Sequence, residues 1–460
     1  MVPHSPTVLR LFVWCTLIAV CAGPVLAQGQ AMSDAAPSEA PTGLFGQDSL
    51  TNGWFGMAAP LKDKGIVLGA IETAEVLGNV TGGSKTGTIF EGRLELDLDL
   101  DLDRILGLPN TVLHANAYQI HGRGLSGNYL AGNAQTVSSI EATRATRLFD
   151  LWVERGFYDN ALSVRIGQIA ADDEFFTSQY AAGLINATFG WPALMSLALP
   201  NGGPVYPLAT PGIRVKYAFN NALALQAAIF NGDPAGGDPG TSAGGVDPQA
   251  SNPDGLRFPV DHSALLIAEL SYSPGADGSA VPATVYKLGI WRQGGRYDDA
   301  SVDTAGRPLT DPLSNGRPRP HDGDFGIYAV ADMLLFNLEG SADRSLSGFF
   351  RTGGDPGDRN FVDYYVDGGL LLKGPFGGRV DDVASLGVSY AASSGPAGTP
   401  GYQAALEASY QVTLAPWWSV QPDMQMVFHP GPAGPRPAAA TASPRVGNAF
   451  VLGLRTSIRF

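Results

Sequence analysis

The chain has 460 residues, 44% of them hydrophobic, and 43 acidic residues against 29 basic ones give a formal net charge of −14. This acidic balance argues against nucleic acid as a partner, because phosphate binding requires clustered lysine and arginine. Both cysteines, Cys15 and Cys21, lie near the N-terminus, so the rest of the chain does not depend on disulfides for its stability.

Residues 1–27 have the pattern of a secretory signal. Arg10 precedes an apolar run that ends at Ala27, an arrangement typical of a segment removed after export. The alternative is an uncleaved anchor, but Gly23 and Pro24 interrupt a run that is already short of the roughly 18 apolar residues of a membrane helix. No later stretch reaches that length either, so a membrane-embedded form of this protein would have to cross the bilayer as strands.

Segments of alternating polarity bounded by Gly, Pro, Asn and Asp predict sixteen strands between residue 66 and the C-terminus. They lie at 66–76, 88–103, 111–121, 147–156, 162–170, 212–219, 222–230, 263–272, 283–293, 324–336, 344–352, 361–373, 383–392, 402–415, 418–428 and 448–460. The fold class that we predict is all-β, a transmembrane antiparallel β-barrel. Residues 28–60 are expected to form a periplasmic N-terminal segment, and residues 61–460 the barrel.

The stretch from Arg93 to Arg104 has the clearest alternation in the chain. Leucine occupies every even position from 94 to 102, and a carboxylate occupies every odd position from 95 to 103. A strand sends successive side chains to opposite faces, so the leucines share one face and the acids the other. A soluble sandwich would bury the leucines, whereas an outer-membrane barrel would turn them to lipid and the acids to a watery lumen.

The connections favour the barrel. Every second connection is short, as in LGLPN and FYDN, and the intervening ones include long segments such as 172–211. Outer-membrane barrels sort their connections in this way, with short periplasmic turns and long extracellular loops. The chain ends on an amphipathic strand that stops at Phe460, which resembles the terminal signal by which the barrel-assembly machinery recognises its substrates.

Several stretches resemble the carbohydrate-selective porin family, often called OprB. They are NGWFGMAAPLKDKGIVLGAIETAEVLGNVTGG, FEGRLELDLDLDLDRILGLPN, LFDLWVERGFYDNALSVRIGQIAADDEFF, ATFGWPAL with ATPGIRVKY, and LRTSIRF. Phe55 departs from the glycine expected in that family's opening. The resemblance covers essentially the whole chain after residue 27. It implies a sixteen-stranded channel in the outer membrane of a Gram-negative bacterium for passive diffusion of glucose and similar sugars, with no cofactor.

The lumen and a constriction provide the candidate site residues. Loop 172–211 is too long to be an idle connection, and its aromatic and acidic residues suit a segment folded into the lumen. Aromatic rings can cover the apolar face of a sugar, while charged groups hydrogen-bond its hydroxyls. The predicted pathway residues are Glu91, Arg93, Glu95, Asp97, Asn116, Asp150, Trp152, Glu154, Arg165, Asp172, Asp173, Glu174, Phe175 and Phe176. Each of these residues could instead have a structural role. Charges in a lumen often pair only to hold the wall in shape, and the loop could pack on the extracellular rim or at a subunit contact.

Other functions are less consistent with the sequence. A secreted glycoside hydrolase needs two isolated carboxylates, and an enzyme is not expected because no motif such as H-E-x-x-H or G-x-S-x-G occurs after residue 27. An anion porin would need clustered basic residues. A general porin without sugar preference remains the alternative. Sugars and outer-membrane lipid are the expected partners. The architecture leads us to expect a homotrimer, with a single barrel as the alternative.

Overall fold

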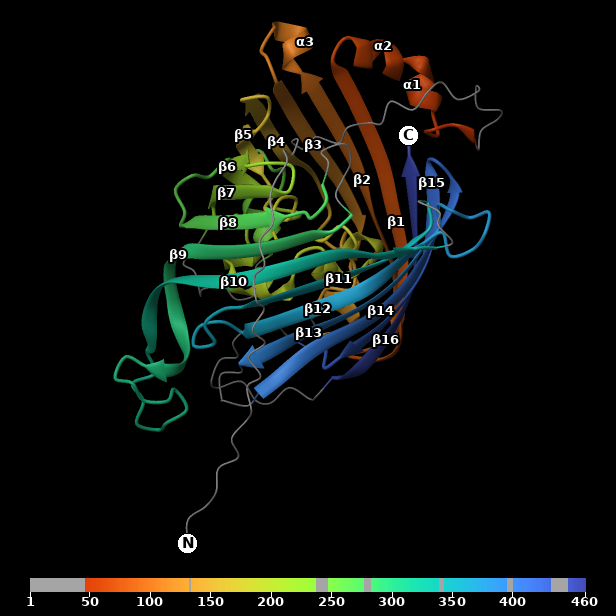
Figure 1. The fold of residues 1–460 in the computed structure, drawn as a ribbon. Coiled ribbons are helices and arrows are strands. Elements are labelled where there is room, and N and C mark those ends of the chain that lie inside the picture. Colours follow the sequence, from red (N-terminus) through yellow and green to blue (C-terminus); the bar gives the residue numbers. More distant parts are fainter. Residues whose placement is uncertain are drawn as a thin grey trace.

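The computed structural model describes residues 46–131, 134–236, 247–276, 283–338, 343–394, 400–431 and 446–460. Within them the strands form one closed antiparallel barrel, in which each strand pairs with its neighbours in the sequence and β16 pairs with β1 (Figure 1). The predicted sixteen-stranded barrel is thus confirmed. The predicted signal, residues 1–27, lies outside the described residues.

The strands are β1 (Ile66–Gly83), β2 (Gly87–Asp101), β3 (Thr111–Gly122), β4 (Ala145–Phe157), β5 (Leu162–Ile169), β6 (Thr210–Ala218), β7 (Leu223–Asn231), β8 (Ala264–Tyr272), β9 (Val285–Asp303), β10 (Pro318–Asn337), β11 (Ser345–Gly354), β12 (Val362–Lys373), β13 (Val383–Ser394), β14 (Pro400–Ala415), β15 (Trp418–Phe428) and β16 (Gly447–Arg459). The helical segments are α1 (Asn52–Gly56), α2 (Ala58–Asp63), α3 (Leu102–Leu106), α4 (Ser126–Tyr129), η2 (Ala181–Gly183), η3 (Ala187–Phe189), α5 (Ala193–Ala198), η4 (Pro200–Gly202) and η5 (Pro248–Ser251). Among the described residues, no helix is long and apolar enough to cross a membrane.

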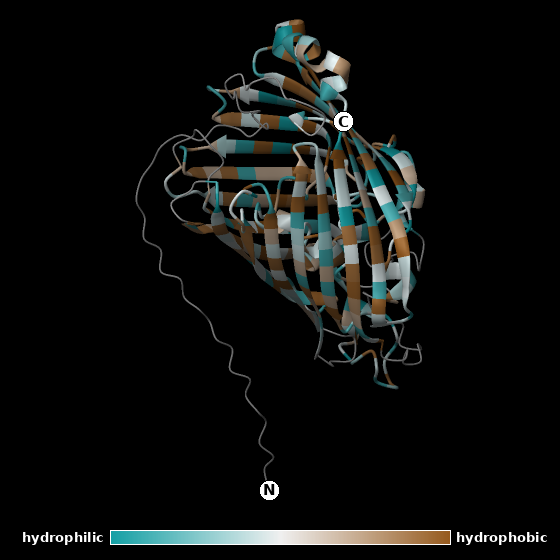
Figure 2. Cartoon of the chain, turned by 90° about the vertical axis from the view of Figure 1, so that its right-hand side faces the viewer, coloured by the Kyte–Doolittle hydropathy of each residue, from teal (hydrophilic) through white to brown (hydrophobic). Residues whose placement is uncertain are grey.

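The strands alternate in polarity as the leucine-acid stretch predicts. On β2, Leu96 and Phe90 are exposed on the outer face, whereas Glu91 is buried on the inner face. Exposed apolar side chains continue around the ring, among them Ile166, Ile213, Leu225, Leu266, Ile290, Ile327, Leu370, Val388, Leu406 and Leu454. Figure 2 shows this as alternating hydrophobic and hydrophilic bands along the strands. Such an encircling apolar belt suits lipid and would be unfavourable in water.

The acidic strand is shorter than predicted. We expected residues 88–103 to be extended, but β2 ends at Asp101, whose carboxylate accepts hydrogen bonds from the backbone N–H groups of Asp103 (3.0 Å) and Arg104 (3.2 Å). This cap starts α3, which ends at Gly107 in the left-handed conformation. Asp103 therefore lies in α3 and not on the lumen wall.

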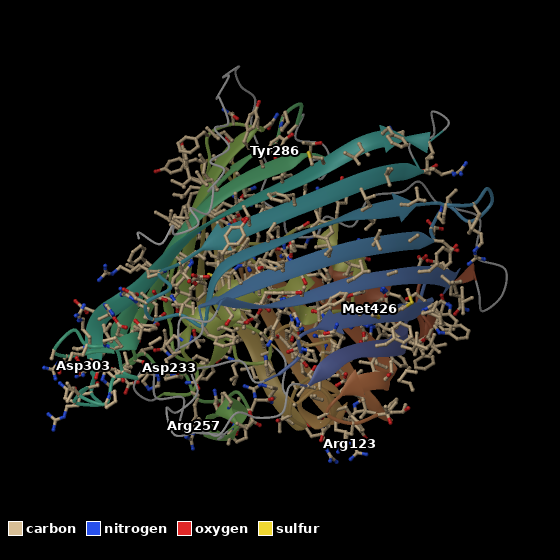
Figure 3. All side chains as sticks on the ribbon, turned by 90° about the horizontal axis from the view of Figure 1, so that it is seen from below. Arg123, Asp233, Arg257, Tyr286, Asp303 and Met426 are labelled. Atoms are coloured by element: carbon tan, nitrogen blue, oxygen red, sulfur yellow. The ribbon has the colours of Figure 1, made fainter. Side chains whose placement is uncertain are left out.

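Three strands are much longer than predicted, and the first of them, β1, continues from the expected end at residue 76 to Gly83. The expected strands 283–293 and 324–336 extend to Asp303 and from Pro318, so β9 and β10 continue past the barrel as a paired ribbon (Figure 1). Figure 3 shows this ribbon, marked by Asp303, projecting away from the ring. The Asp303 carboxylate orders the ribbon's tip by accepting hydrogen bonds from the N–H groups of Arg307 (2.8 Å) and Asn315 (2.9 Å). We did not expect strands here, because residues 298–322 contain several prolines, glycines and aspartates, which are typical of turns and loops.

The two ends of the barrel differ. α1, α2, α3 and the C-terminus lie at one end, where the predicted short turns are also found (Figure 1). The long segments 123–144, 170–209 and 232–263 leave from the other end. Not every connection there is long, since residues 84–86 join β1 to β2 directly. The loop after β3 covers this turn, because the N–H groups of Ser84 and Lys85 donate to the carbonyl of Tyr129.

Candidate functional site

The segment between β5 and β6, residues 170–209, contacts the inner wall of the barrel on several strands. Glu269 on β8 accepts a hydrogen bond from the N–H of Phe176 (3.0 Å), and Asp332 on β10 accepts one from the N–H of Gln179 (2.9 Å). Farther around the ring, Glu407 on β14 accepts one from the N–H of Ile185 (2.5 Å). Wall carboxylates thus hold the loop's backbone, which fills much of the barrel interior beside β8 to β14.

One arginine secures the centre of this loop. Arg351 on β11 is fully buried and pairs with the equally buried Asp367 on β12 at 2.5 Å. Its remaining N–H groups donate to the loop carbonyls of Phe176 (3.1 Å), Thr188 (3.0 Å) and Gly190 (3.0 Å). A planar guanidinium has several donors in a fixed fork, so one side chain can bind a carboxylate and three carbonyls at once.

The predicted pathway residues Phe175 and Phe176 belong to this packing. Both side chains are fully buried, and the ring of Phe176 stacks on that of Tyr328 with the centroids 4.2 Å apart. Phe175 packs edge-on against Phe230. The two rings therefore attach the loop to the wall and do not line the water-filled passage in this structure.

The wall that the loop leaves accessible runs along β2 to β6. Its central feature is an ion-pair network around Glu154 and Glu174. Arg165 on β5 lies 2.7 Å from each of these carboxylates, and Arg214 on β6 lies 2.9 Å from Glu154 and 3.1 Å from Glu174. Arg165 keeps 12% of its side chain exposed and Glu154 keeps 18%, so the network borders water.

Trp152 lies between two charged or polar groups. The guanidinium of Arg165 sits 3.6 Å from the centre of its ring system, and the imidazole of His114 stacks on it at 4.7 Å. His114 in turn hydrogen-bonds Asp99 on β2 at 2.7 Å. Because Arg165 and His114 both lie over the ring system, Trp152 positions these two groups and is not an open platform for a sugar ring.

A second group of polar residues lies on β2 and β3. Arg93 pairs with Glu95 at 2.8 Å, and its guanidinium also lies over the rings of Tyr118 (4.5 Å) and Tyr206 (5.1 Å). Asn116 donates to Glu95 (3.1 Å) and to Asp97 (2.6 Å). The predicted set on β2 and β3 is therefore brought together, apart from Glu91, which is buried farther along the strand.

The acidic residues at the start of the loop have different surroundings. Asp150 is buried on β4, whereas Asp173 is exposed. Asp172 accepts a hydrogen bond from the N–H of Tyr206 at 3.2 Å, and its other oxygen is buried without a hydrogen-bond partner. Burial, together with the charge of the neighbouring Asp173, raises the pKa of Asp172 to about 8.

The prediction missed three residues of this site. Arg214, Tyr118 and Tyr206 were not among the predicted pathway residues, although two of them could have been found by alternation. In GIRVKY the exposed Ile213 and Val215 flank Arg214, which puts the arginine on the inner face. Tyr206 lies in the loop, where alternation carries no information.

The described residues contain one group that could hold a metal ion, formed by Asp299, His321 and Asp358 on the outer ribbon and the β11–β12 loop. His321 lies 2.9 Å from Asp299 and 3.7 Å from Asp358. Arg359 pairs with Asp358 at 2.8 Å, so a cation already neutralises one of the three donors.

Comparison with known proteins agrees with this architecture. The family model "Carbohydrate-selective porin, OprB family" matches residues 85–460. Porin B of Pseudomonas aeruginosa is 24% identical over 440 residues, covering 88% of this chain and 90% of that protein.

The high-pH structure of Pseudomonas putida OprB shares the fold, with a TM-score of 0.78 and 23% identity over 90% of this chain and 99% of that one. Its low-pH structure gives a TM-score of 0.55 with 18% identity over the same shares of the two chains. The chain therefore belongs to the carbohydrate-selective porin family, OprB, and its closed barrel is that of a sugar channel in the outer membrane of a Gram-negative bacterium.

Proposed function

We propose that sugars cross this channel along the β2–β6 wall, in contact with Arg165, Glu154 and Glu174 at the level where the loop meets this wall and with Arg93 and Glu95 on one side of it. Five other predicted pathway residues lie on the same wall or where it borders the loop: Asp97, Asn116, Trp152, Asp172 and Asp173. Sugar hydroxyls both donate and accept hydrogen bonds, so alternating guanidinium and carboxylate groups offer each hydroxyl a charged partner.

One observation carries this proposal. Opposite charges at this level are paired at 2.7 Å and yet keep part of their surface in water. The two arginines and two glutamates of this network balance in charge and so do not favour free ions of one sign, but each group retains lone pairs or N–H donors for a neutral, hydroxyl-rich solute. A basic wall would be expected for anions.

Single-channel recording tests the assignment. Glucose added to the bath should reduce the ion current through the wild-type channel in a concentration-dependent manner, and Arg165→Gln should weaken this block about tenfold, because a hydrogen bond to a charged group contributes roughly 1.5–3 kcal/mol. Arg155→Gln is the matched control, since Arg155 is an exposed arginine on the neighbouring strand, over the ring of Phe157. Current that is indifferent to glucose in the wild-type channel would favour a general porin.

We further propose that residues 1–27 are a cleaved export signal and that residues 28–60 form a periplasmic segment. The support is that α1 and α2 lie at the short-turn end of the barrel, where the N–H of Leu50 donates to the carbonyl of Arg459 at 2.8 Å. Sequencing the N-terminus of the mature protein tests the cleavage. A mature protein that retains residues 1–27 would contradict it.

For assembly, we propose that the barrel-assembly machinery recognises β16 with its terminal Phe460. The support is the amphipathic pattern of that strand, in which Leu452 and Leu454 are exposed outward and the Glu75–Arg455 ion pair lies inside. Deleting Phe460 should lower the amount of heat-modifiable barrel in outer membranes, whereas Phe460→Tyr should preserve it. Equal amounts from the deletion and the wild type would contradict this role.

We also propose a homotrimer. Its support is a polar group on the outer face, in which His121 lies 3.4 Å from Glu72 and 3.0 Å from Gln119. Glu72 and Gln119 both pair in register with the outward Leu94, and hydrocarbon offers such groups no hydrogen bonds. Native mass spectrometry should find three chains in the wild type and fewer in Glu72→Ala, with Leu266→Ala as an outer-face control. A wild-type protein that is monomeric in several mild detergents would contradict the trimer.

A further inference from the structure

A groove of about 480 Å³ lies at the extracellular rim of the barrel, on its outer side. Its lining includes Val76, Thr88, Phe90, Arg123 and Arg144. β1, β2 and the ends of β3 and β4 supply these residues, so the groove crosses from the lipid-facing wall to the start of the extracellular loop. Neither the channel passage nor the loop of residues 170–209 contributes to it.

The half of the groove nearer the membrane is apolar. Val76 and Phe90 are 47% and 51% exposed, and they lie opposite each other in register on β1 and β2. Both belong to the outward row that contains Leu96, so hydrocarbon chains of the outer leaflet would lie against them.

The half nearer the loop is basic. Arg123 follows the end of β3 and Arg144 directly precedes β4, and both side chains are exposed. Within the parts of the chain that the structure describes, no ion pair is found for either arginine. The backbone N–H of Arg123 donates to the carbonyl of Phe90 at 3.1 Å, which holds the base of this arginine next to the aromatic ring. Figure 3 shows Arg123 at the outer edge of the barrel.

Two carboxylates stand nearby, but neither forms an ion pair with Arg123 or Arg144 among the described residues. Glu141 and Asp247 line a neighbouring cavity that also includes Arg123 and Arg144. Glu141 is engaged by the N–H of Ser126, at 3.1 Å from each carboxylate oxygen. Although the chain has a net charge of −14, this rim thus presents two exposed guanidinium groups next to lipid-facing side chains, and the described residues supply neither of them with an ion pair.

We propose that this groove binds a phosphorylated glycolipid of the outer leaflet, with its phosphate between Arg123 and Arg144 and an acyl chain along Val76 and Phe90. Arginine forks match phosphate oxygens in geometry as well as in charge. An inorganic phosphate would use the basic half alone, whereas the apolar half of the groove fits only a ligand that also carries hydrocarbon. The site thus lies outside the sugar pathway, and its failure would leave the proposed function untouched.

Titration of the purified full-length protein with bis-phosphorylated lipid A, followed by native mass spectrometry, tests the proposal. Each basic residue near a charged lipid surface contributes about 1 kcal/mol, so we expect affinity to fall roughly fivefold in Arg123→Gln or Arg144→Gln and roughly 30-fold in the double variant. Arg317→Gln is the matched control, because Arg317 is an exposed arginine on the outer ribbon. Heat-modifiable mobility of each variant establishes that the barrel has folded.

Three results would overturn the proposal. The first is unchanged lipid A affinity in the folded double variant, and the second is equal binding of dephosphorylated lipid A to the wild type. The third is displacement of lipid A by inorganic phosphate at an equal concentration, which would identify a simple anion site. In cells, a photo-crosslinker at Thr88 should capture glycolipid.

Discussion

Removal of the Arg351 guanidinium should detach the loop of residues 170–209 while leaving the barrel closed. The Arg351→Leu change leaves the buried Asp367 carboxylate without its cation and three loop carbonyls without donors. Breaking one side of a buried ion pair costs about 3–5 kcal/mol. If that cost falls on loop docking, the ratio of docked to undocked loop drops by between roughly 100-fold and several thousand-fold.

Single-channel recording detects this change directly. The loop occupies much of the lumen, so its detachment should raise the mean conductance and add gating noise, and proteases should then cut the loop. Arg379→Leu is the control, because Arg379 pairs with Asp382 in the β12–β13 turn and donates to the carbonyl of Thr413, and both partners lie outside the loop of residues 170–209. The double variant Arg351→Leu with Asp367→Leu no longer contains the unpaired carboxylate, but the three loop carbonyls still lack donors. We therefore expect it to recover more of the wild-type thermal stability than of the wild-type low current noise.

The result that would refute this reasoning is a folded Arg351→Leu channel with wild-type conductance, wild-type noise and an intact loop after proteolysis. Docking would then depend on the carboxylates of β8, β10 and β14 alone. The same recordings on Glu407→Gln would identify which contact dominates, because Glu407 accepts two loop N–H groups, from Ile185 (2.5 Å) and Asn186 (2.9 Å).

Three further predictions concern packing, lipid contact and pH. Phe176→Ala should destabilise the docked loop by about 3–5 kcal/mol through the cavity it leaves, seen as increased current noise, whereas Phe376→Ala at an exposed position should leave the current unchanged. Leu96→Arg should lower the free energy of unfolding in bilayers by about 2–4 kcal/mol, and no loss on chemical denaturation would show that Leu96 does not meet lipid. Burial, followed by the charges of Asp324 and Asp363, raises the pKa of Asp355 in the β11–β12 loop to about 10. The folded state then holds a proton that the unfolded state releases above about pH 4. The free energy of unfolding should therefore fall as the pH rises from about 4 to about 10, by up to about 1.4 kcal/mol per pH unit. Asp355→Asn should raise Tm at pH 8 but not at pH 4.

Alternation determined what the sequence could predict. Side chains alternate between the two faces of each strand, and one face meets lipid. The local sequence alone therefore indicates that Leu96 faces outward and Glu95 faces the lumen, without knowledge of the neighbouring strands. The same rule would have placed Arg214 inside the barrel. It also explains why wall residues such as Glu95 and Arg165 were expected on the inner face while the ends of β1, β2, β9 and β10 were misplaced, since segments outside the bilayer need not alternate between an apolar and a polar face.

The loop was beyond this reasoning for a different reason. Its contacts join residues far apart in the chain, such as Ile185 with Glu407 and Phe176 with Arg351. Composition indicated that aromatic and acidic residues would enter the lumen, but it could not distinguish a ring that meets solute from a ring that meets the wall. The burial of Phe175 and Phe176 and the position of Trp152 against Arg165 and His114 both depend on these distant pairings.

The pairing of β1 with β16 sets a condition on biosynthesis. Ile71 lies opposite Arg459, so the seam is made by residues at nearly opposite ends of the chain. A chain from which β16 is missing has two unsatisfied strand edges, at β1 and at β15, and cannot seal them. Because closure requires β16, a partly synthesised chain that lacks this strand cannot form a closed pore.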